Sequence, residues 1–219
     1  RCRYVVRCFY IECRIRHIPN GVDLARFDGA VDRHTVRARH GLDRDAFLFL
    51  SVGRNHPKKN YAALIEATAL LAADTSTARP FELAIVGNGV SNLATMVDDL
   101  GLSGQITLID QIGGNEATTL NPLLPAAALI ELYKAADAFV FPSLMETFGV
   151  AIVEAMAAGL PVIAGDSPGC RDVVRRDRDG VLVPPHDRGA LAGAMAMALG
   201  DNDKRTGLAA SALVRARDF

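Results

Sequence analysis

Residues 138–164 read AFVFPSLMETFGVAIVEAMAAGLPVIA, and this stretch contains two kinds of apolar pattern. Short apolar runs at 138–141 and 161–164 predict two buried strands. The residues between them, from about 149 to 158, predict a helix that is apolar nearly all round and therefore belongs in the protein interior. Two buried strands connected by a helix are the repeating unit of a parallel sheet.

The same alternation continues on both sides of this stretch. It predicts further strands at 47–52, 81–86, 106–109 and 181–183, and helices at 61–73, 91–100, 128–136, 171–176 and beyond 183. Strands that are apolar on both faces form a parallel sheet covered by helices, and right-handed crossovers make it doubly wound. The predicted fold class is therefore α/β, with a Rossmann-like doubly wound parallel sheet. Sheets of this kind bind ligands beyond the carboxyl ends of their strands.

The composition limits the class of protein. Hydrophobic residues make up 50% of the chain and charged residues 22%, which is typical of a globular domain. The formal net charge of −1 provides no general attraction for nucleic acid or for an anionic membrane. No apolar run approaches the roughly 20 residues of a membrane-spanning helix. We therefore expect no nucleic-acid partner and a cytoplasmic location, which includes the cytoplasmic face of a membrane.

Residues 1–17 fit the alternating pattern poorly. They contain five arginines and three cysteines, Cys2, Cys8 and Cys13, whose spacing matches neither a zinc site nor a redox pair. We interpret these cysteines as free thiols of a reducing compartment. Because the chain starts with an arginine, we interpret 1–17 as the remnant of a missing N-terminal domain or as an irregular lead-in. The predicted domain covers 18–200, followed by a helical segment at 201–219.

Two glutamates in the opening stretch indicate a binding site. Glu154 is the only charge on the predicted interior helix, and an unpaired carboxylate there would be costly. It therefore needs a partner, either a protein cation in a buried ion pair or a ligand hydroxyl. Glu146 lies in the turn before the helix. The backbone N–H groups of Thr147, Phe148 and Gly149 at the helix N-terminus suit an anion such as a phosphate.

A second motif follows the first predicted strand. Residues 52–60 read VGRNHPKKN and place two or three cations in a glycine turn at the carboxyl end of the strand. Arginine and lysine in this position suit a diphosphate, although a solvated turn with surface lysines is the alternative. His56 precedes a proline, and we interpret it as a turn residue rather than as a base.

Together with IPNGVD at 18–23 and YKAADAFVFPS at 133–143, these motifs closely resemble glycosyltransferase family 4. The resemblance runs from about residue 18 to residue 183, with the motifs in the right order and spacing. Glu146 and Glu154 match the pair of glutamates, with seven residues between them, of that family. The resemblance implies one half of a GT-B fold, the C-terminal nucleotide-sugar-binding domain of a glycosyltransferase that retains the anomeric configuration.

The resemblance also implies roles for individual residues. Arg54 and Lys59 would hold the donor diphosphate and stabilise the leaving group, and Glu146 would contact the donor sugar. Glu154 would bind the ribose hydroxyls. The remaining donor-binding residues that we predict are Gly53, Gly87, Asp110, Gln111, Ile112, Thr147, Phe148, Gly149 and Val150. The segment 168–173 resembles a glycine-rich turn of the family, with Asp172 where a glutamate is usual.

The resemblance implies a nucleoside-diphosphate sugar as donor substrate and neither a cofactor nor a metal. Asp-x-Asp patterns, which metal-dependent glycosyltransferases use, occur at Asp43/Asp45, Asp177/Asp179 and Asp201/Asp203. We interpret all three as surface pairs in turns or at helix ends, where aspartate is common. Many relatives act on lipid-linked acceptors, so peripheral membrane association of the parent enzyme stays open.

Two other functions remain as alternatives. GNGVSN at 87–92, with Asp110 about 20 residues further on, partly matches the dinucleotide fingerprint of an NAD-dependent oxidoreductase, but Asn92 replaces the third glycine. The other alternative is a non-catalytic remnant that keeps the nucleotide-sugar site. The acceptor site of GT-B enzymes lies in the N-terminal domain, so we expect the isolated chain to bind a nucleotide sugar and to transfer little.

Overall fold

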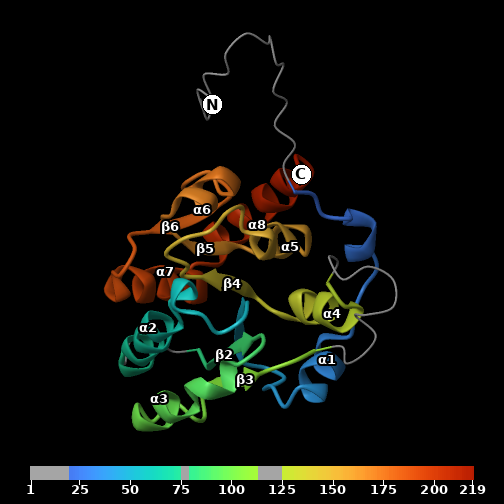
Figure 1. Ribbon diagram of the computed structural model, residues 1–219. Coiled ribbons are helices and arrows are strands. Elements are labelled where there is room, and N and C mark those ends of the chain that lie inside the picture. Colours follow the sequence, from blue (N-terminus) through green and yellow to red (C-terminus); the bar gives the residue numbers. More distant parts are fainter. Residues whose placement is uncertain (1–19, 75–78, 113–124) are drawn as a thin grey trace.

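The computed structural model describes residues 20–74, 79–112 and 125–219. Segment 1–17, with Cys2, Cys8 and Cys13, lies outside the described residues. The strands are β1 (Phe47–Val52), β2 (Phe81–Val86), β3 (Ile106–Ile109), β4 (Ala138–Phe141), β5 (Val162–Gly165) and β6 (Gly180–Val183) (Figure 1). The α-helices are α1 (Arg33–Arg39), α2 (Tyr61–Ala73), α3 (Ala94–Asp99), α4 (Ala127–Ala135), α5 (Val150–Ala157), α6 (Pro168–Val173), α7 (Arg188–Gly200) and α8 (Asn202–Ala216). Three short 3₁₀ helices are η1 (Leu24–Phe27), η2 (Pro57–Lys59) and η3 (Val90–Leu93).

The six described strands form one parallel sheet in the order β3-β2-β1-β4-β5-β6. This is the strand order of the classic doubly wound Rossmann sheet, so the predicted fold class is confirmed. The direction of winding reverses between β1 and β4. At such a switch point the connections leave the two neighbouring strands toward opposite faces, which opens a crevice at their carboxyl ends.

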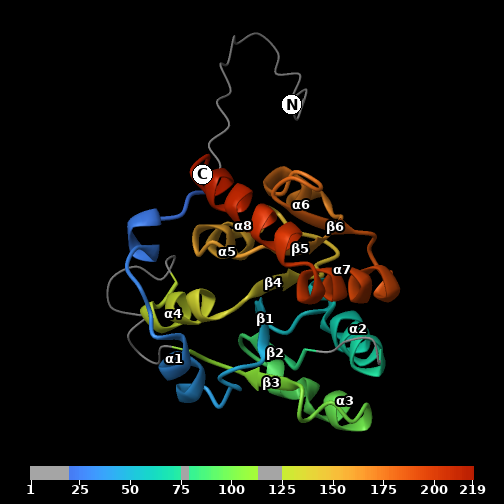
Figure 2. The same cartoon turned by 180° about the vertical axis from the view of Figure 1, so that it is seen from behind.

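Each face of the sheet is buried under its own helices, as Figures 1 and 2 show. In β1, Leu48 and Leu50 point into a cluster with η1, α1, α4, α5, α6 and α8. Phe47 and Phe49 point into a second cluster with α2, α3 and α7. Because successive side chains of a strand point to opposite faces, burial on both sides requires the continuous apolar runs from which the strands were predicted.

Two helices differ from the expectation. Helix α1 was not predicted; Asp32 caps it by accepting hydrogen bonds from the backbone N–H of His34 and from the hydroxyl of Thr35. The helix predicted at 171–176 was placed three residues too late, because α6 begins at Pro168. Proline suits the first turn of a helix, since its fixed φ is helical and no hydrogen bond is lost there.

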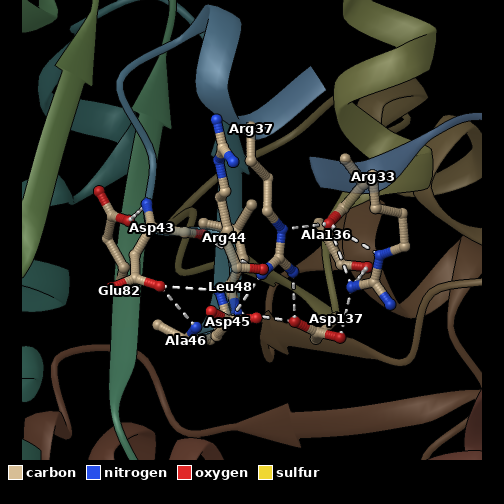
Figure 3. A network of polar contacts seen from close by, with 11 residues as sticks. Arg33, Arg37, Asp43, Arg44, Asp45, Ala46, Leu48, Glu82, Ala136 and Asp137 are labelled. Atoms are coloured by element: carbon tan, nitrogen blue, oxygen red, sulfur yellow. Dashed lines mark hydrogen bonds and ion pairs between the residues drawn. The ribbon is translucent and has the colours of Figure 1, made fainter. Parts of the chain in front are cut away.

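An ion network closes the amino-terminal edge of the sheet, which is the side where the parallel strands begin (Figure 3). Arg37 is only 3% exposed, and its guanidinium donates to Asp137 Oδ2 at 2.7 Å and to the carbonyls of Ala46 and Ala135 at 2.7 and 3.0 Å. Asp137 also accepts from the N–H of Leu48 at 2.8 Å and from Arg33 at 2.6 Å. Burial alone would raise the pKa of Asp137, but these donors and cations hold it below its ordinary value.

One of the three Asp-x-Asp pairs is not a surface pair. Asp179 is fully buried, and it accepts hydrogen bonds from Arg175 Nη2 at 2.7 Å and from Ser211 Oγ at 2.9 Å. The interpretation as a surface residue was therefore wrong for Asp179, which connects the turn before β6 to α8. Asp43 and Asp201 do accept backbone hydrogen bonds in a turn and at a helix start. Within the described ranges, no group of three or more histidine, cysteine or acidic residues is placed to hold a metal ion.

Helix α8 packs against α5, and its Ala212 and Ala216 are fully buried. The domain boundaries at 17/18 and 200/201 stay predictions. None of the helices in the described part of the chain is long and apolar enough to span a membrane.

Candidate functional site

The loops after β1 and β2 are in direct contact at the carboxyl edge of the sheet. The N–H of Gly53 donates to the carbonyl of Val86 at 2.8 Å, and the N–H of Asn55 donates to the carbonyl of Asn88 at 2.8 Å. At Gly87 the φ angle is +145°, and a Cβ there would lie 2.2 Å from the carbonyl oxygen of Gly53. Only glycine tolerates this approach, so Gly53 and Gly87 allow the two loops to pack directly against each other.

The loop after β4 is fastened to the loop after β1, across the switch point. The N–H of Leu144 donates to the carbonyl of Lys58 at 2.8 Å, and Ser143 Oγ lies 2.9 Å from the same oxygen. Asn60 Nδ2 donates to the carbonyl of Pro142 at 3.4 Å. These bonds bring the two motifs of the sequence, VGRNHPKKN and SLMETFG, to one place.

Lys59 and Glu146 form an ion pair at this junction. The Nζ of Lys59 lies 2.6 Å from Oε1 of Glu146, and the two side chains are 20% and 16% exposed. Ser143 donates to the same oxygen at 2.7 Å, and the Nζ lies 4.5 Å from the centre of the Phe141 ring. An ammonium group has three donors, so Lys59 can keep Glu146 and still bind an anion.

Arg54 is a second cation at this edge. It follows Gly53, its side chain is exposed, and it makes no hydrogen bond or ion pair with any residue that the structure describes. An exposed, uncompensated guanidinium is suited to bidentate binding of a phosphate.

The N-terminus of α5 faces the same edge. Its N-cap is Gly149, with φ +78°, and no side chain caps the helix. The N–H of Ile152 donates to the Gly149 carbonyl at 2.9 Å, which leaves the N–H groups of Val150 and Ala151 at the helix start for an anion, and the helix dipole favours one there. Thr147 and Val150 are exposed, and Phe148 is half-buried. These three residues flank the glycine.

Glu154 lies on α5 with 8% of its surface exposed. Burial raises the pKa of its carboxyl group to about 7, despite the hydrogen bond from Tyr133 and the charge of Arg26. The hydroxyl of Tyr133 donates to Oε2 at 2.9 Å, while among the described residues no donor bonds to Oε1 and no cation lies within 4.0 Å. The partner is thus a tyrosine hydroxyl rather than the cation of an ion pair, and one oxygen is left for a ligand.

The three residues predicted near the base lie after β3. Asp110 accepts from the N–H of Ser91 at 2.9 Å, and hydrogen bonds from Ser91 lower its pKa. It therefore holds the start of η3. Gln111 is exposed and Ile112 half-buried. With β2 between β3 and β1, this group begins about 10 Å from the Gly53 loop.

Sequence reasoning missed two hydroxyls of the site, those of Ser143 and Tyr133. Both lie in the quoted motifs, but neither was given a role. Tyr133 could have been found from hydrogen bonding. The buried carboxylate of Glu154 requires a donor, and a tyrosine hydroxyl on the buried face of the preceding helix requires an acceptor.

Comparisons with known proteins place this geometry in a family. The model of the family described as glycosyl transferases group 1 matches residues 32–213. The chain belongs to the group 1 glycosyltransferases. A D-inositol 3-phosphate glycosyltransferase of Catenulispora acidiphila is 37% identical over 207 residues, which cover 94% of this chain and 48% of that protein. This group 1 glycosyltransferase chain thus spans about half the length of the curated relatives it matches.

Solved structures have the same fold. The Anabaena protein HepE, in complex with UDP and glucose, superposes with a TM-score of 0.76 at 24% identity, covering 91% of this chain and 51% of that chain. The C-terminal domain of a group 1 glycosyltransferase protein of Francisella tularensis superposes with a TM-score of 0.72 at 23% identity. That match covers 90% of this chain and 97% of the solved domain. Both confirm a GT-B type, Rossmann-like architecture for this group 1 glycosyltransferase chain.

Proposed function

We propose that this chain is the donor-binding half of a retaining family 4 glycosyltransferase and that it binds a nucleoside-diphosphate sugar at the carboxyl edge of its sheet. The observation that carries the proposal is the meeting of Lys59, Glu146 and the uncapped start of α5 at one switch point. A cation, a hydroxyl acceptor and an anion-binding helix terminus are what the diphosphate and the sugar of such a donor require. The HepE structure is a complex with UDP and glucose, which supports this choice of ligand.

The chemistry of transfer follows from these groups. When the bond between the anomeric carbon and the phosphate oxygen breaks, negative charge develops on the diphosphate. Arg54, Lys59 and the N–H groups at the start of α5 stabilise this charge, which lowers the barrier. Glu146, fixed by Lys59 and Ser143, accepts hydrogen bonds from sugar hydroxyls, and Glu154 accepts them from the ribose. We propose no cofactor beyond the donor substrate.

The acceptor site belongs to the other half of the parent protein in this proposal. The curated relatives are about twice as long as the chain, which leaves room for a second Rossmann-like domain. Because these relatives are D-inositol 3-phosphate glycosyltransferases, D-inositol 3-phosphate is the first acceptor to test. We propose a cytoplasmic location for the parent enzyme, including peripheral association with a membrane.

Calorimetric titration of the purified chain with UDP-, GDP- and ADP-glucose tests the proposal. We expect one donor to bind, and we expect Glu154→Ala to abolish that binding. Glu131→Ala, which removes a glutamate of α4 whose side chain is 39% exposed and pairs with Arg39, is the matched control and should leave the affinity unchanged. A folded chain that binds no nucleotide sugar contradicts donor binding by this half alone. Tight binding of NADH in its place would favour the oxidoreductase.

The alternative to the enzyme is a non-catalytic module that keeps the donor site. It predicts the same titration result as the enzyme. The two functions separate when the donor-binding chain is combined with the N-terminal half of a relative: sugar transfer indicates an enzyme half, and tight donor binding with no transfer indicates the non-catalytic module.

A further inference from the structure

The C-terminal end of α8 contacts the loop that precedes α5. The ring of Phe219 meets the ring of Phe148 edge to face, with centroids 5.4 Å apart and an angle of 79° between the planes. Phe148 is adjacent to Gly149, the N-cap of α5. In Figure 2, α8 runs past α5 toward the C-terminus. The turn that begins α5 thus contacts a side chain from the last described residues of the chain.

Arg215 holds Phe219 in place. Its guanidinium carbon lies 4.5 Å from the centre of the Phe219 ring, the geometry of a cation–π contact. The same guanidinium donates to the carbonyls of Val173 and Asp172, at 3.0 and 3.1 Å, and pairs with Asp218 at 2.8 Å. Because two of these bonds reach the carbonyl end of α6, Arg215 fastens α6 to α8.

The other end of α6 touches the turn that carries Glu146. A Cβ at Gly169 would lie 2.3 Å from the carbonyl oxygen of Glu146, so the α6 backbone packs directly against that residue. Helix α6 therefore spans the distance between Arg215 and Glu146. Two chains of contacts therefore start at Arg215 on α8. One reaches Phe148 through Phe219, and the other reaches Glu146 through α6.

The second half of α8 is also held by a hydrogen bond to the turn before β6. Asp179 is fully buried and accepts from Ser211, one helical turn before Arg215, at 2.9 Å. It also lies 4.0 Å from the guanidinium of Arg215. A fully buried carboxylate bound to two elements resists displacement, so the end of α8 has one defined position relative to the sheet.

We propose that Arg215 and Phe219 are positioning residues for the donor site, acting through Phe148 and Glu146. They set the orientation of the α5 N-terminus and the position, relative to the sheet, of the turn that carries Glu146. The inference rests on the proposed function, because the property that it explains is affinity for the diphosphate of a nucleoside diphosphate. Neither side chain is assigned a contact with that ligand.

The test compares variants of the full chain by titration with UDP, GDP and ADP and by hydrogen exchange of the backbone amides. We expect Phe219→Ala to weaken binding of the preferred nucleotide by about three- to tenfold, the equivalent of one lost aromatic pair. Amides 148–151 should exchange faster, while those of β1 and β2 should not change. Phe219→Tyr should restore both properties. Leu213→Ala removes an exposed side chain in the same part of α8 and is the control.

Arg215→Met provides an independent variant, since it keeps the length of the side chain and loses the donors; it should shift the same amides. Wild-type affinity and wild-type exchange at 148–151 in both variants would overturn the proposal. If the wild-type chain binds no nucleotide, the proposed function fails for this half, and the exchange comparison alone then decides the positioning role. Equal acceleration of exchange throughout the sheet would indicate a merely structural role and would also overturn it.

Discussion

The two edges of the sheet use charge in opposite ways. At the amino-terminal edge every nitrogen of the Arg37 guanidinium donates to a protein acceptor, and both oxygens of Asp137 accept. At the carboxyl edge Arg54 makes no bond with a described residue, and Glu154 has one donor for two oxygens. Burial is deep at both edges, for Arg37 and for Glu154 alike. The satisfied edge stabilises the fold, whereas the carboxyl edge keeps a donor group and an acceptor oxygen that the described fold itself does not use.

The largest effect should come from breaking the satisfied edge. Arg37→Met leaves Asp137 partly uncompensated, removes the guanidinium donor to the Ala46 carbonyl and should lower the free energy of unfolding by about 3–5 kcal/mol. Urea denaturation followed by circular dichroism measures this. The fraction that remains folded should bind nucleotide with unchanged affinity. A loss of affinity without a loss of stability would mean that the two edges do not have separate roles.

The second-largest effect concerns Glu154, whose replacement should raise the free energy of unfolding rather than lower it. The pKa of this carboxyl group is about 7 in the folded protein and 4.5 as its ordinary value. A raised carboxyl pKa contributes stability that is fully present below pH 4.5 and is lost as the pH rises through 7. Glu154→Gln should therefore stabilise the ligand-free chain by about 3 kcal/mol at pH 8 and by almost nothing at pH 4.5, because the shift disappears with the charge.

Thermal unfolding at several pH values measures this difference, with Glu131→Gln on the exposed face of α4 as the control. The same substitution should weaken nucleotide-sugar binding, because an amide is a poorer acceptor for ribose hydroxyls than a carboxylate. A variant that is less stable than the wild type at pH 8 would show that Glu154 is not strained by burial.

The difference between the edges also explains what could be predicted from the sequence. Strands β1 to β4 were predicted with their observed bounds because apolar runs on both faces are a local signal. Helix α1 was missed because its sequence, RHTVRAR, has a single buried apolar residue, Val36. It is held instead by the contact of Arg37 with Asp137, 100 residues away, which no local pattern reports.

The site was predictable by residue type and not by contact. Lys59 and Glu146 stood out because each lies in a motif at the end of a strand. Their ion pair depends on the adjacency of β1 and β4, which brings residues 87 positions apart within 2.6 Å. The partner of Glu154 was expected to be a cation or a ligand. It is Tyr133, because α4 packs its buried face against α5.

The third effect should fall on binding alone. Arg54→Ala removes an exposed guanidinium and should leave the unfolding free energy within about 0.5 kcal/mol of the wild type. It should weaken binding of a nucleoside diphosphate by about ten- to a hundredfold, the value of one charge-assisted hydrogen bond. Titration at two salt concentrations measures this. Arg44→Ala, an exposed arginine at the opposite edge, is the control. Equal affinities for the two variants would remove Arg54 from the site.

The smallest effect should come from Tyr133→Phe, which keeps the ring in the core and removes the donor to Glu154. One lost hydrogen bond of about 1 kcal/mol raises the pKa of the carboxyl group further, by about 0.7 pH unit. Since the proposed site binds the ribose through the Glu154 carboxylate, the pH of half-maximal nucleotide affinity should rise from about 7 by the same amount. Thr68→Val removes a buried hydroxyl that donates to the Leu64 carbonyl and should not move that midpoint. If the midpoints of wild type and Tyr133→Phe coincide, the hydroxyl stabilises the core without tuning the ligand-binding carboxylate, and the carboxyl edge is then less distinct from the amino edge than its free oxygen indicates.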